Sequence, residues 1–222
     1  MSNAILLMLL LILTSIVMVL LLAAGPRQLR RKLLRILGLV FPLAVFPLWG
    51  IAVYRLCLLI PSALFLLLEI ARLKKPGGIS RFDRFIALIA KEGEEWHVSG
   101  ISTYFWGALL ASMAPGGIGP AVMAMSTLSD LWASVAGSAR GGKRSALGKT
   151  WFGSAACLLA ALWAGISFAG VFPWSGVSFL HVVVASPVIA AVERITPGEY
   201  DNLAIHASGA AVMVMAGLVI PV

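Results

Sequence analysis

The sequence predicts an all-α protein: a polytopic membrane bundle of about eight transmembrane helices, with a short amphipathic helix on the cytoplasmic side. Of the 222 residues, 60% are hydrophobic and only 12% are charged, and the mean hydropathy is +0.99. Soluble domains carry about 25% charged residues, so this composition indicates an integral membrane protein. No polar domain, internal repeat or low-complexity tract interrupts the chain. We therefore expect residues 1–222 to form a single transmembrane domain.

Eight apolar runs account for the predicted spans, although two of them are shorter than the roughly 17–25 residues that usually cross a bilayer. They cover residues 4–24, 34–53, 56–71, 101–115, 117–136, 152–172, 175–193 and 203–222. The first run has no basic segment before it and is followed by basic residues, which favours a retained span over a cleaved signal peptide. The fourth run contains Gly107 and ends at Pro115-Gly116-Gly117, so we expect it to be kinked.

The distribution of Lys and Arg supports a count of eight spans. With eight, 16 of the 17 Lys and Arg residues fall on one side of the membrane and only Arg55 falls on the other, whereas seven would scatter them. The positive-inside rule places the basic side in the cytoplasm and both termini outside, and we expect the plasma (inner) membrane. This rule explains the net charge of +8 without nucleic acid as a partner.

The longest polar connection, 72–100, contains the predicted amphipathic helix. Residues 80–90 read SRFDRFIALIA, in which the apolar side chains fall on one helical face, namely Phe82, Phe85, Ile86 and Ile89. A short helix with this pattern is expected to lie on the membrane surface. The loops 72–100, 137–151 and 193–202 would then share the cytoplasmic face.

Asp130 and the loop that follows it form the strongest candidate site. A carboxylate within an apolar run costs a few kcal/mol at membrane depth, which makes Asp130 a functional candidate. Glycines let the backbone approach a phosphate group closely, and cationic side chains supply the positive charge that binds it. We expect a nucleotide to bind the loop through Gly137, Arg140, Gly141, Lys143, Arg144, Gly148 and Lys149. The alternative is a loop that only sets the topology, with Asp130 paired to one of its bases.

Mg²⁺ is the cofactor that these residues favour. It prefers oxygen ligands and is usually held by one or two carboxylates together with substrate phosphates. Asp130 supplies one carboxylate, and the stretch from Glu193 to Asn202, ERITPGEYDN, supplies a second group through Asp201 and Asn202. Asp201 also opens the last apolar run, where capping of a helix is an equally good explanation.

Two further groups of acidic residues lie in the 72–100 region or next to it. Glu69 and Arg72 have the i,i+3 spacing of a local ion pair, which is the simpler interpretation. Glu94 and Glu95 belong to a short acidic segment that is usually a solvated loop. The more specific hypothesis is that these four residues contact a substrate or position the groups that do.

Five stretches in this order resemble the dolichol kinase, phytol kinase and CTP-dependent diacylglycerol kinase family, polyprenol kinase-like membrane proteins related to phosphatidate cytidylyltransferase. EIARLKKP at 69–76 is similar to E-x-x-R-x-x-x-P, and 94–107, EEWHVSGISTYFWG, is similar to E-x-x-x-x-[ST]-G-x-x-Y-[FL]-x-x-G. Residues 130–154 resemble D-x-x-A-x-x-x-G, a basic glycine loop and G-K-[ST]-x-E-G-S. The basic stretch at 30–37 and the late E-x-x-[ST]-P-x-x-x-DN at 193–202 complete the match.

The resemblance implies transfer of a phosphoryl group, usually from CTP, to the hydroxyl of a membrane lipid alcohol, with Mg²⁺ as the cation. It implies that Asp130 and Asp201 hold the metal and that Lys149 acts on the transferring phosphoryl group. A carboxylate from Glu94, Glu95 or Glu193 would accept the proton of the lipid hydroxyl. The chain departs from the pattern at Phe152, where the family has glutamate.

Two alternatives stay open at this point. A lipid-phosphate cytidylyltransferase would need the same metal and loop but would direct the attack at the α-phosphate. A degenerate relative without activity is consistent with Phe152. The sequence also leaves open the lipid acceptor, the choice between CTP and ATP, and whether the chain forms a homodimer.

Overall fold

The computed structural model describes residues 36–74, 98–140, 145, 147–198 and 200–219. Over these residues the protein is helical and contains no β-strand, so the predicted all-α class is confirmed. The elements are η1 (Phe41–Val45), α3 (Phe46–Lys74), α5 (Gly100–Ser112), α6 (Ile118–Arg140), α7 (Trp151–Val171), η3 (Pro173–Ser175), α8 (Phe179–Ile195) and α9 (Asp201–Val219). The first apolar run, the 80–90 segment, Glu94 and Glu95 lie outside the described residues.

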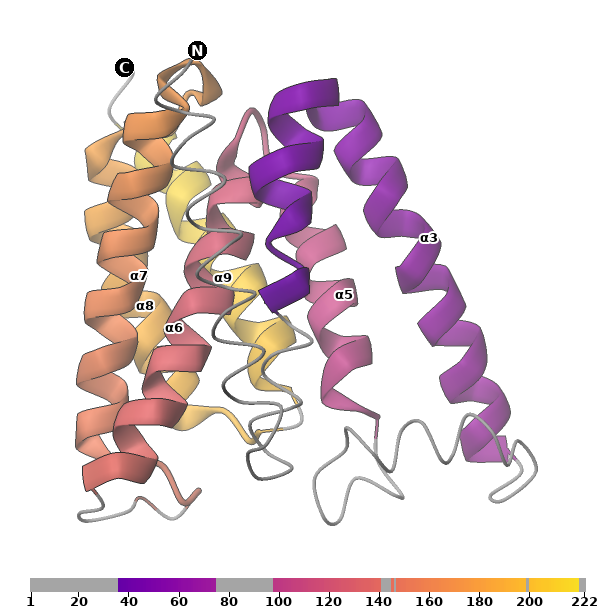
Figure 1. Cartoon of the computed structure of the whole chain (residues 1–222), viewed down its shortest axis with the longest axis vertical. Helices are drawn as coiled ribbons and strands as arrows, with labels where there is room; N and C mark the ends of the chain where they lie inside the picture. Colours follow the sequence, from indigo (N-terminus) through magenta and orange to yellow (C-terminus); the bar gives the residue numbers. More distant parts are fainter. Residues whose placement is uncertain (1–35, 75–97, 141–144, 146, 199, 220–222) are drawn as a thin grey trace.

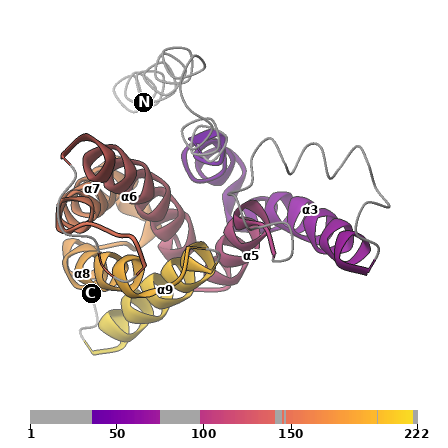
Figure 2. The same cartoon turned by 90° about the horizontal axis from the view of Figure 1, so that it is seen from below.

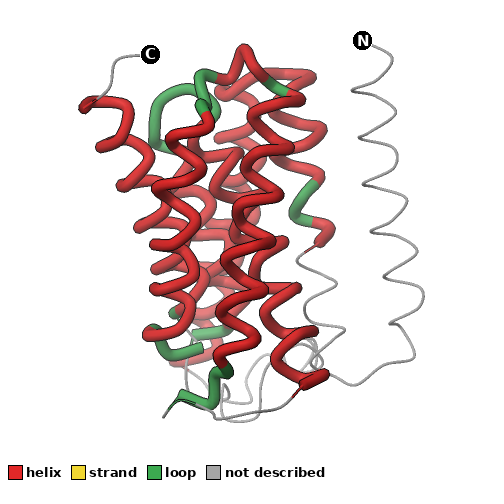
Figure 3. Tube along the Cα trace, turned by 90° about the vertical axis from the view of Figure 1, so that its left-hand side faces the viewer, coloured by secondary structure: helices red, strands yellow, loops and turns green. Residues whose placement is uncertain are grey.

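The helices α6, α7, α8 and α9 form the main bundle, in which each packs against its neighbours in the chain or across the bundle (Figures 1 and 2). Helix α5 joins this bundle through α9 and α6, and α3 lies outermost against α5. The long helices share one general direction, as the tube in Figure 3 shows. The chain therefore passes repeatedly between the two ends of the bundle.

Among the described residues, two helices are long and apolar enough to cross a membrane, Phe41–Lys74 and Trp151–Val171. Helix α5, with 13 residues, is shorter than the usual span, and α8, with 17 residues, is at the lower limit. Many large apolar side chains on α3 are exposed, including Leu59, Ile60 and Leu67. A contiguous apolar surface of this kind favours association with a membrane, while the count of eight spans is not confirmed.

The second and third apolar runs meet at Gly50 rather than at Arg55. Gly50 has φ 77° and ψ −178°, a conformation that L side chains rarely adopt, and the chain reverses direction there (Figure 1). The predicted ends of these runs, 53 and 56, were therefore wrong by several residues. Arg55 lies within α3 and donates to the carbonyls of Ser112 and Ala114, at 2.8 and 3.3 Å. It thereby satisfies carbonyl groups that the end of α5 leaves without helical partners.

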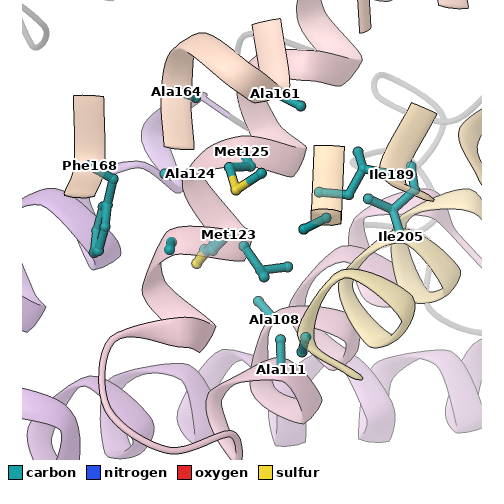
Figure 4. Close-up of a cluster of buried hydrophobic side chains, with 14 of the residues drawn as sticks. Ala108, Ala111, Met123, Ala124, Met125, Ala161, Ala164, Phe168, Ile189 and Ile205 are labelled. Atoms are coloured by element: carbon teal, nitrogen blue, oxygen red, sulfur yellow. The ribbon is translucent and has the colours of Figure 1, made fainter. Parts of the chain in front are cut away.

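The core is built from small and flexible side chains. Alanines from α5, α6 and α7 are buried beside the sulfur-containing side chains of Met123 and Met125 (Figure 4). Small residues allow helix backbones to approach closely, which is how helices associate in membranes. The thioethers fill the irregular gaps that remain.

Gly107 is a packing residue and not the predicted kink, because α5 continues through it without a break to Ser112. A Cβ at this position would lie 3.0 Å from the carbonyl oxygen of Asn202 and 3.0 Å from the Cα of Leu203. The missing side chain therefore lets the first turn of α9 lie directly against α5.

Gly107→Ala is expected to lower the free energy of unfolding by about 1–3 kcal/mol, since the new methyl group must push two backbones apart. Thermal unfolding of the purified protein in detergent measures this change. Gly170→Ala is the matched control, because a Cβ at that helical position meets nothing within 4 Å. Equal stability of the two variants would contradict this account of the α5–α9 contact.

Candidate functional site

Six helix ends meet at one end of the bundle, the lower end in Figure 1. The C-terminal ends of α3, α6 and α8 and the N-terminal ends of α5, α7 and α9 lie there. Most of the candidate residues from the sequence belong to these ends or to the connections between them. The structure then decides which of their side chains come together.

Lys149 is the centre of a buried group of charges at this end. Its Nζ lies 3.1 Å from Oε1 of Glu193 and 3.6 Å from Oδ2 of Asp201. The same ammonium group donates a hydrogen bond to the backbone carbonyl of Glu193, near the C-terminal end of α8. One lysine therefore connects the start of α7 with the end of α8 and the start of α9.

Asp130 completes what we call the carboxylate–lysine cluster: Asp130, Lys149, Glu193 and Asp201. Only 8% of Asp130, 7% of Glu193 and 6% of Asp201 is exposed. The negative charges of Asp130 and Asp201 both act on the Glu193 carboxylate, so each of these two acids lies within electrostatic reach of Glu193. Three carboxylates and one ammonium group leave these four ionised side chains with two excess negative charges.

Asp201 has an oxygen without a hydrogen-bond partner. Its Oδ2 faces Lys149, whereas its Oδ1 is fully buried and accepts no hydrogen bond from the described residues. A buried carboxylate oxygen without a donor costs free energy, and native structures usually satisfy such atoms with protein, water or an ion. The free Oδ1 is therefore not explained by the helix-capping interpretation.

The turn before α7 places Lys149 in this position. Ser145 and Gly148 close the turn through backbone hydrogen bonds of 2.7 and 2.8 Å, and Gly148 has φ 75°. Thr150 then caps α7 by accepting a hydrogen bond from the amide of Gly153, at 3.1 Å. A constrained turn followed at once by a helix cap fixes the direction of the side chain between them.

Gly137 does not belong to a loop, because α6 extends to Arg140. The predicted loop therefore starts later, and Gly137 serves the contact between α6 and α7: a Cβ there would lie 3.0 Å from Oγ1 of Thr150. Gly141, Lys143 and Arg144 lie outside the described residues, as does the side chain of Arg140. The nucleotide-binding role expected of these four residues stays a prediction.

Glu69 and Arg72 form the local ion pair that their spacing predicts. The guanidinium donates to Oε2 of Glu69 at 2.7 and 2.9 Å, and both side chains are buried. The other oxygen, Oε1, accepts from the amide of Ser99 at 2.9 Å and from the hydroxyl of Ser102 at 2.8 Å. This pair therefore joins the end of α3 to the start of α5.

Asn202 was predicted to be a metal ligand beside Asp201, and this role stays a prediction; its amide nitrogen donates to the carbonyl of Gly100, at 2.9 Å. The side chain thus binds α5 from the first turn of α9. Sequence reasoning gave no role to Ser126, which lies 2.9 Å from His206 in the same region. A serine within an apolar helix has no periodic pattern that would single it out.

Within the described residues, no three His, Cys, Asp or Glu side chains gather closely enough to hold a metal ion by themselves. Mg²⁺ needs fewer protein ligands than this, because it is usually held by one or two carboxylates and takes its other ligands from water and substrate phosphates. The unpartnered Oδ1 of Asp201 fits such a cation.

Comparisons with protein-family models, curated proteins and solved structures found no match to this chain. The family resemblance consequently depends on the motifs alone.

Proposed function

We propose that this protein is a membrane lipid kinase, which transfers a phosphoryl group from a nucleoside triphosphate, CTP by the family resemblance, to the hydroxyl of a lipid alcohol. The observation that supports this most is the carboxylate–lysine cluster with its unpartnered Asp201 oxygen. Its three acids are buried, it joins four separate segments of the chain, and three of its members lie at helix ends: Lys149 precedes α7, Glu193 lies near the end of α8 and Asp201 starts α9.

The position of the cluster suits a reaction between a lipid and a nucleotide. A lipid alcohol has its hydroxyl near the membrane surface and a nucleotide reaches it from the water, so the chemistry belongs at one end of the bundle. We propose eight spans with this end in the cytoplasm and both termini outside; protection of a C-terminal tag from external protease in intact cells would contradict this topology.

Asp130 and Asp201 are the side chains that would hold Mg²⁺, which when bound neutralises phosphate charge and aligns the phosphates. Lys149 already binds anionic oxygens of Glu193 and Asp201, so its ammonium group is positioned to bind phosphate oxygens at the same place. Positioning and charge stabilisation are the main contributions that proteins make to phosphoryl transfer.

Glu193 is the carboxylate of the cluster that we assign as the proton acceptor. The lipid hydroxyl oxygen forms a bond to the γ-phosphorus, the bond from this phosphorus to the β-phosphate oxygen breaks, and the nucleoside diphosphate leaves. The hydroxyl proton passes to the Glu193 carboxylate, whose Oε1 lies 3.1 Å from Lys149. A positioned base of this kind typically contributes about 10²–10⁴-fold to the rate.

Phe152 does not remove a carboxylate from the cluster. It lies in the first turn of α7 and is 48% exposed, while the three acids of the cluster are buried. Glu193 supplies a third acid beside Lys149 from another helix. The departure from the family motif therefore leaves the proposed chemistry with the groups that it needs.

The test uses the full chain purified in detergent with Mg²⁺, CTP labelled at either the γ- or the α-phosphate, and a pool of diacylglycerol, polyprenols, phytol and phosphatidic acid. We expect label from the γ position alone to appear in lipid, and chromatography of the product then identifies the acceptor. Transfer from the α position alone would replace the proposal with a cytidylyltransferase. No transfer from CTP, ATP or GTP, together with no nucleotide binding, would refute the enzyme.

A further inference from the structure

Ser126 on α6 and His206 on α9 form a buried polar contact between the two helices that carry Asp130 and Asp201. The Oγ of Ser126 lies 2.9 Å from Nε2 of His206. The other ring nitrogen, Nδ1, lies 2.6 Å from the backbone oxygen of Asn202, one turn earlier on α9. Both side chains are buried, and the ring of Tyr104 packs against the imidazole with its edge, at 5.4 Å between centroids.

The hydrogen-bond partners determine which ring nitrogen carries the proton. A carbonyl oxygen only accepts, so Nδ1 must be the protonated nitrogen that donates to Asn202. The bond between Nε2 and the Ser126 hydroxyl can run in either direction, since this hydroxyl also donates to the carbonyl of Met123, at 3.1 Å. His206 therefore acts as a bridge, since one ring nitrogen bonds Ser126 of α6 and the other donates to the first turn of α9.

This bridge lies next to the carboxylate–lysine cluster. Ser126 precedes Asp130 by four residues on α6, which is one helical turn. On α9 the bridge ends at the carbonyl of Asn202, the residue that follows Asp201. The same carbonyl oxygen of Asn202 would lie 3.0 Å from a Cβ at Gly107, so α5 also packs against this turn. The first turn of α9 thus contacts α5 as well as the bridge.

We infer that the Ser126–His206 bridge is a positioning device, which sets Asp201 relative to Asp130 so that both carboxylates serve one cation. The inference rests on the proposed function, because it gives the two acids a common ligand. Neither Ser126 nor His206 contacts the nucleotide in this account; they act through the first turn of α9. Residues that orient the ligands of a metal typically change affinity or activity by about 10–100-fold when they are altered.

Three variants test the bridge. Ser126→Ala removes the hydroxyl group of the bridge. His206→Asn has a shorter side chain, whose amide group no longer reaches α6. His206→Gln places an amide group near the position of Nε2. Thr127→Val is the matched control on α6. It removes an equally buried hydroxyl, which bonds Tyr104 at 2.9 Å and not α9.

The activity readout is the Mg²⁺ concentration that gives half-maximal phosphoryl transfer. We expect Ser126→Ala and His206→Asn to raise it about 10-fold, with a smaller change in the maximal rate, while His206→Gln recovers part of the loss. Thr127→Val is expected to stay within about 2-fold of the unaltered protein. An equal rise in Thr127→Val would refute the positioning role, because it would show general loosening of α6.

The second readout does not depend on activity. Hydrogen exchange of a peptide that covers the first turn of α9 is expected to become faster in Ser126→Ala and His206→Asn, whereas exchange at 210–218 stays unchanged. Equal acceleration of both segments, or of neither, would refute the bridge as a local device. A protein without transferase activity would refute the proposed function, and the exchange data would still decide the positioning role.

Discussion

Asp130→Asn is expected to reduce phosphoryl transfer by at least about 10²-fold while the fold stays intact. The substitution keeps the size and shape of the side chain but removes the negative charge that would hold the cation. Loss of one preorganised charge or donor at a reacting phosphate or oxyanion typically costs about 10²–10³-fold. Initial rates at saturating lipid and nucleotide measure the effect.

The stability of the same variant provides the complementary measurement. Asp130 repels Glu193, and the substitution relieves this repulsion. Because asparagine keeps the shape of the side chain and its ability to accept a hydrogen bond, the variant is expected to stay folded. Thr127→Val is again the control, since it alters a buried side chain on the same helix one turn away. Full activity of Asp130→Asn would remove this residue from the proposed site.

Lys149→Met is expected to lower the free energy of unfolding by about 3–5 kcal/mol, in addition to abolishing transfer. Breaking a buried ion pair by removing one partner leaves the other charge uncompensated, and effects of this size are typical. Here the substitution removes the partner of both Glu193 and Asp201, and it leaves the backbone carbonyl of Glu193 without its donor. Thermal or denaturant unfolding in detergent measures the loss.

Two further variants sharpen this prediction. Arg194→Met removes a cation from the same end of the bundle, but Arg194 stacks on Trp151 at 3.6 Å and donates to Ser154, and it pairs with no buried carboxylate of the described residues. Its expected cost is about 1 kcal/mol or less. Glu193→Gln added to Lys149→Met should restore part of the stability, because it removes one of the charges left unpaired. If Lys149→Met cost no more than Arg194→Met, the cluster would not be a coupled group of charges.

Much of the fold could be predicted from the sequence because helices in an apolar chain follow local rules. The seven apolar runs that fall on described residues all appear as helices, and their connections coincide with glycines, prolines and charges. The errors occurred where a contact between helices decided the outcome. Gly107 looked like a kink because a glycine within a helix usually weakens it, yet α9 needs the space that it leaves.

The candidate site was predictable in part for a similar reason. Asp130, Glu193 and Asp201 were candidates because carboxylates are rare in apolar runs. Lys149 was a candidate because it belongs to the basic, glycine-rich loop. Their meeting could not be predicted from spacing, because it depends on how α6, α7, α8 and α9 are arranged around one another. The same arrangement brings Ser126 to His206, over 80 residues of sequence.

By itself, the sequence determined the helical class, the apolar character and the short list of charged residues that an apolar bundle has to accommodate. These properties follow from composition and local periodicity, which neighbouring residues alone establish. Only the tertiary structure decided the partners on other helices: Glu69 with the start of α5, and Lys149 with Glu193 and Asp201. A buried charge takes the partner that the packed helices bring within about 4 Å, and that choice is made when the helices pack rather than along the chain.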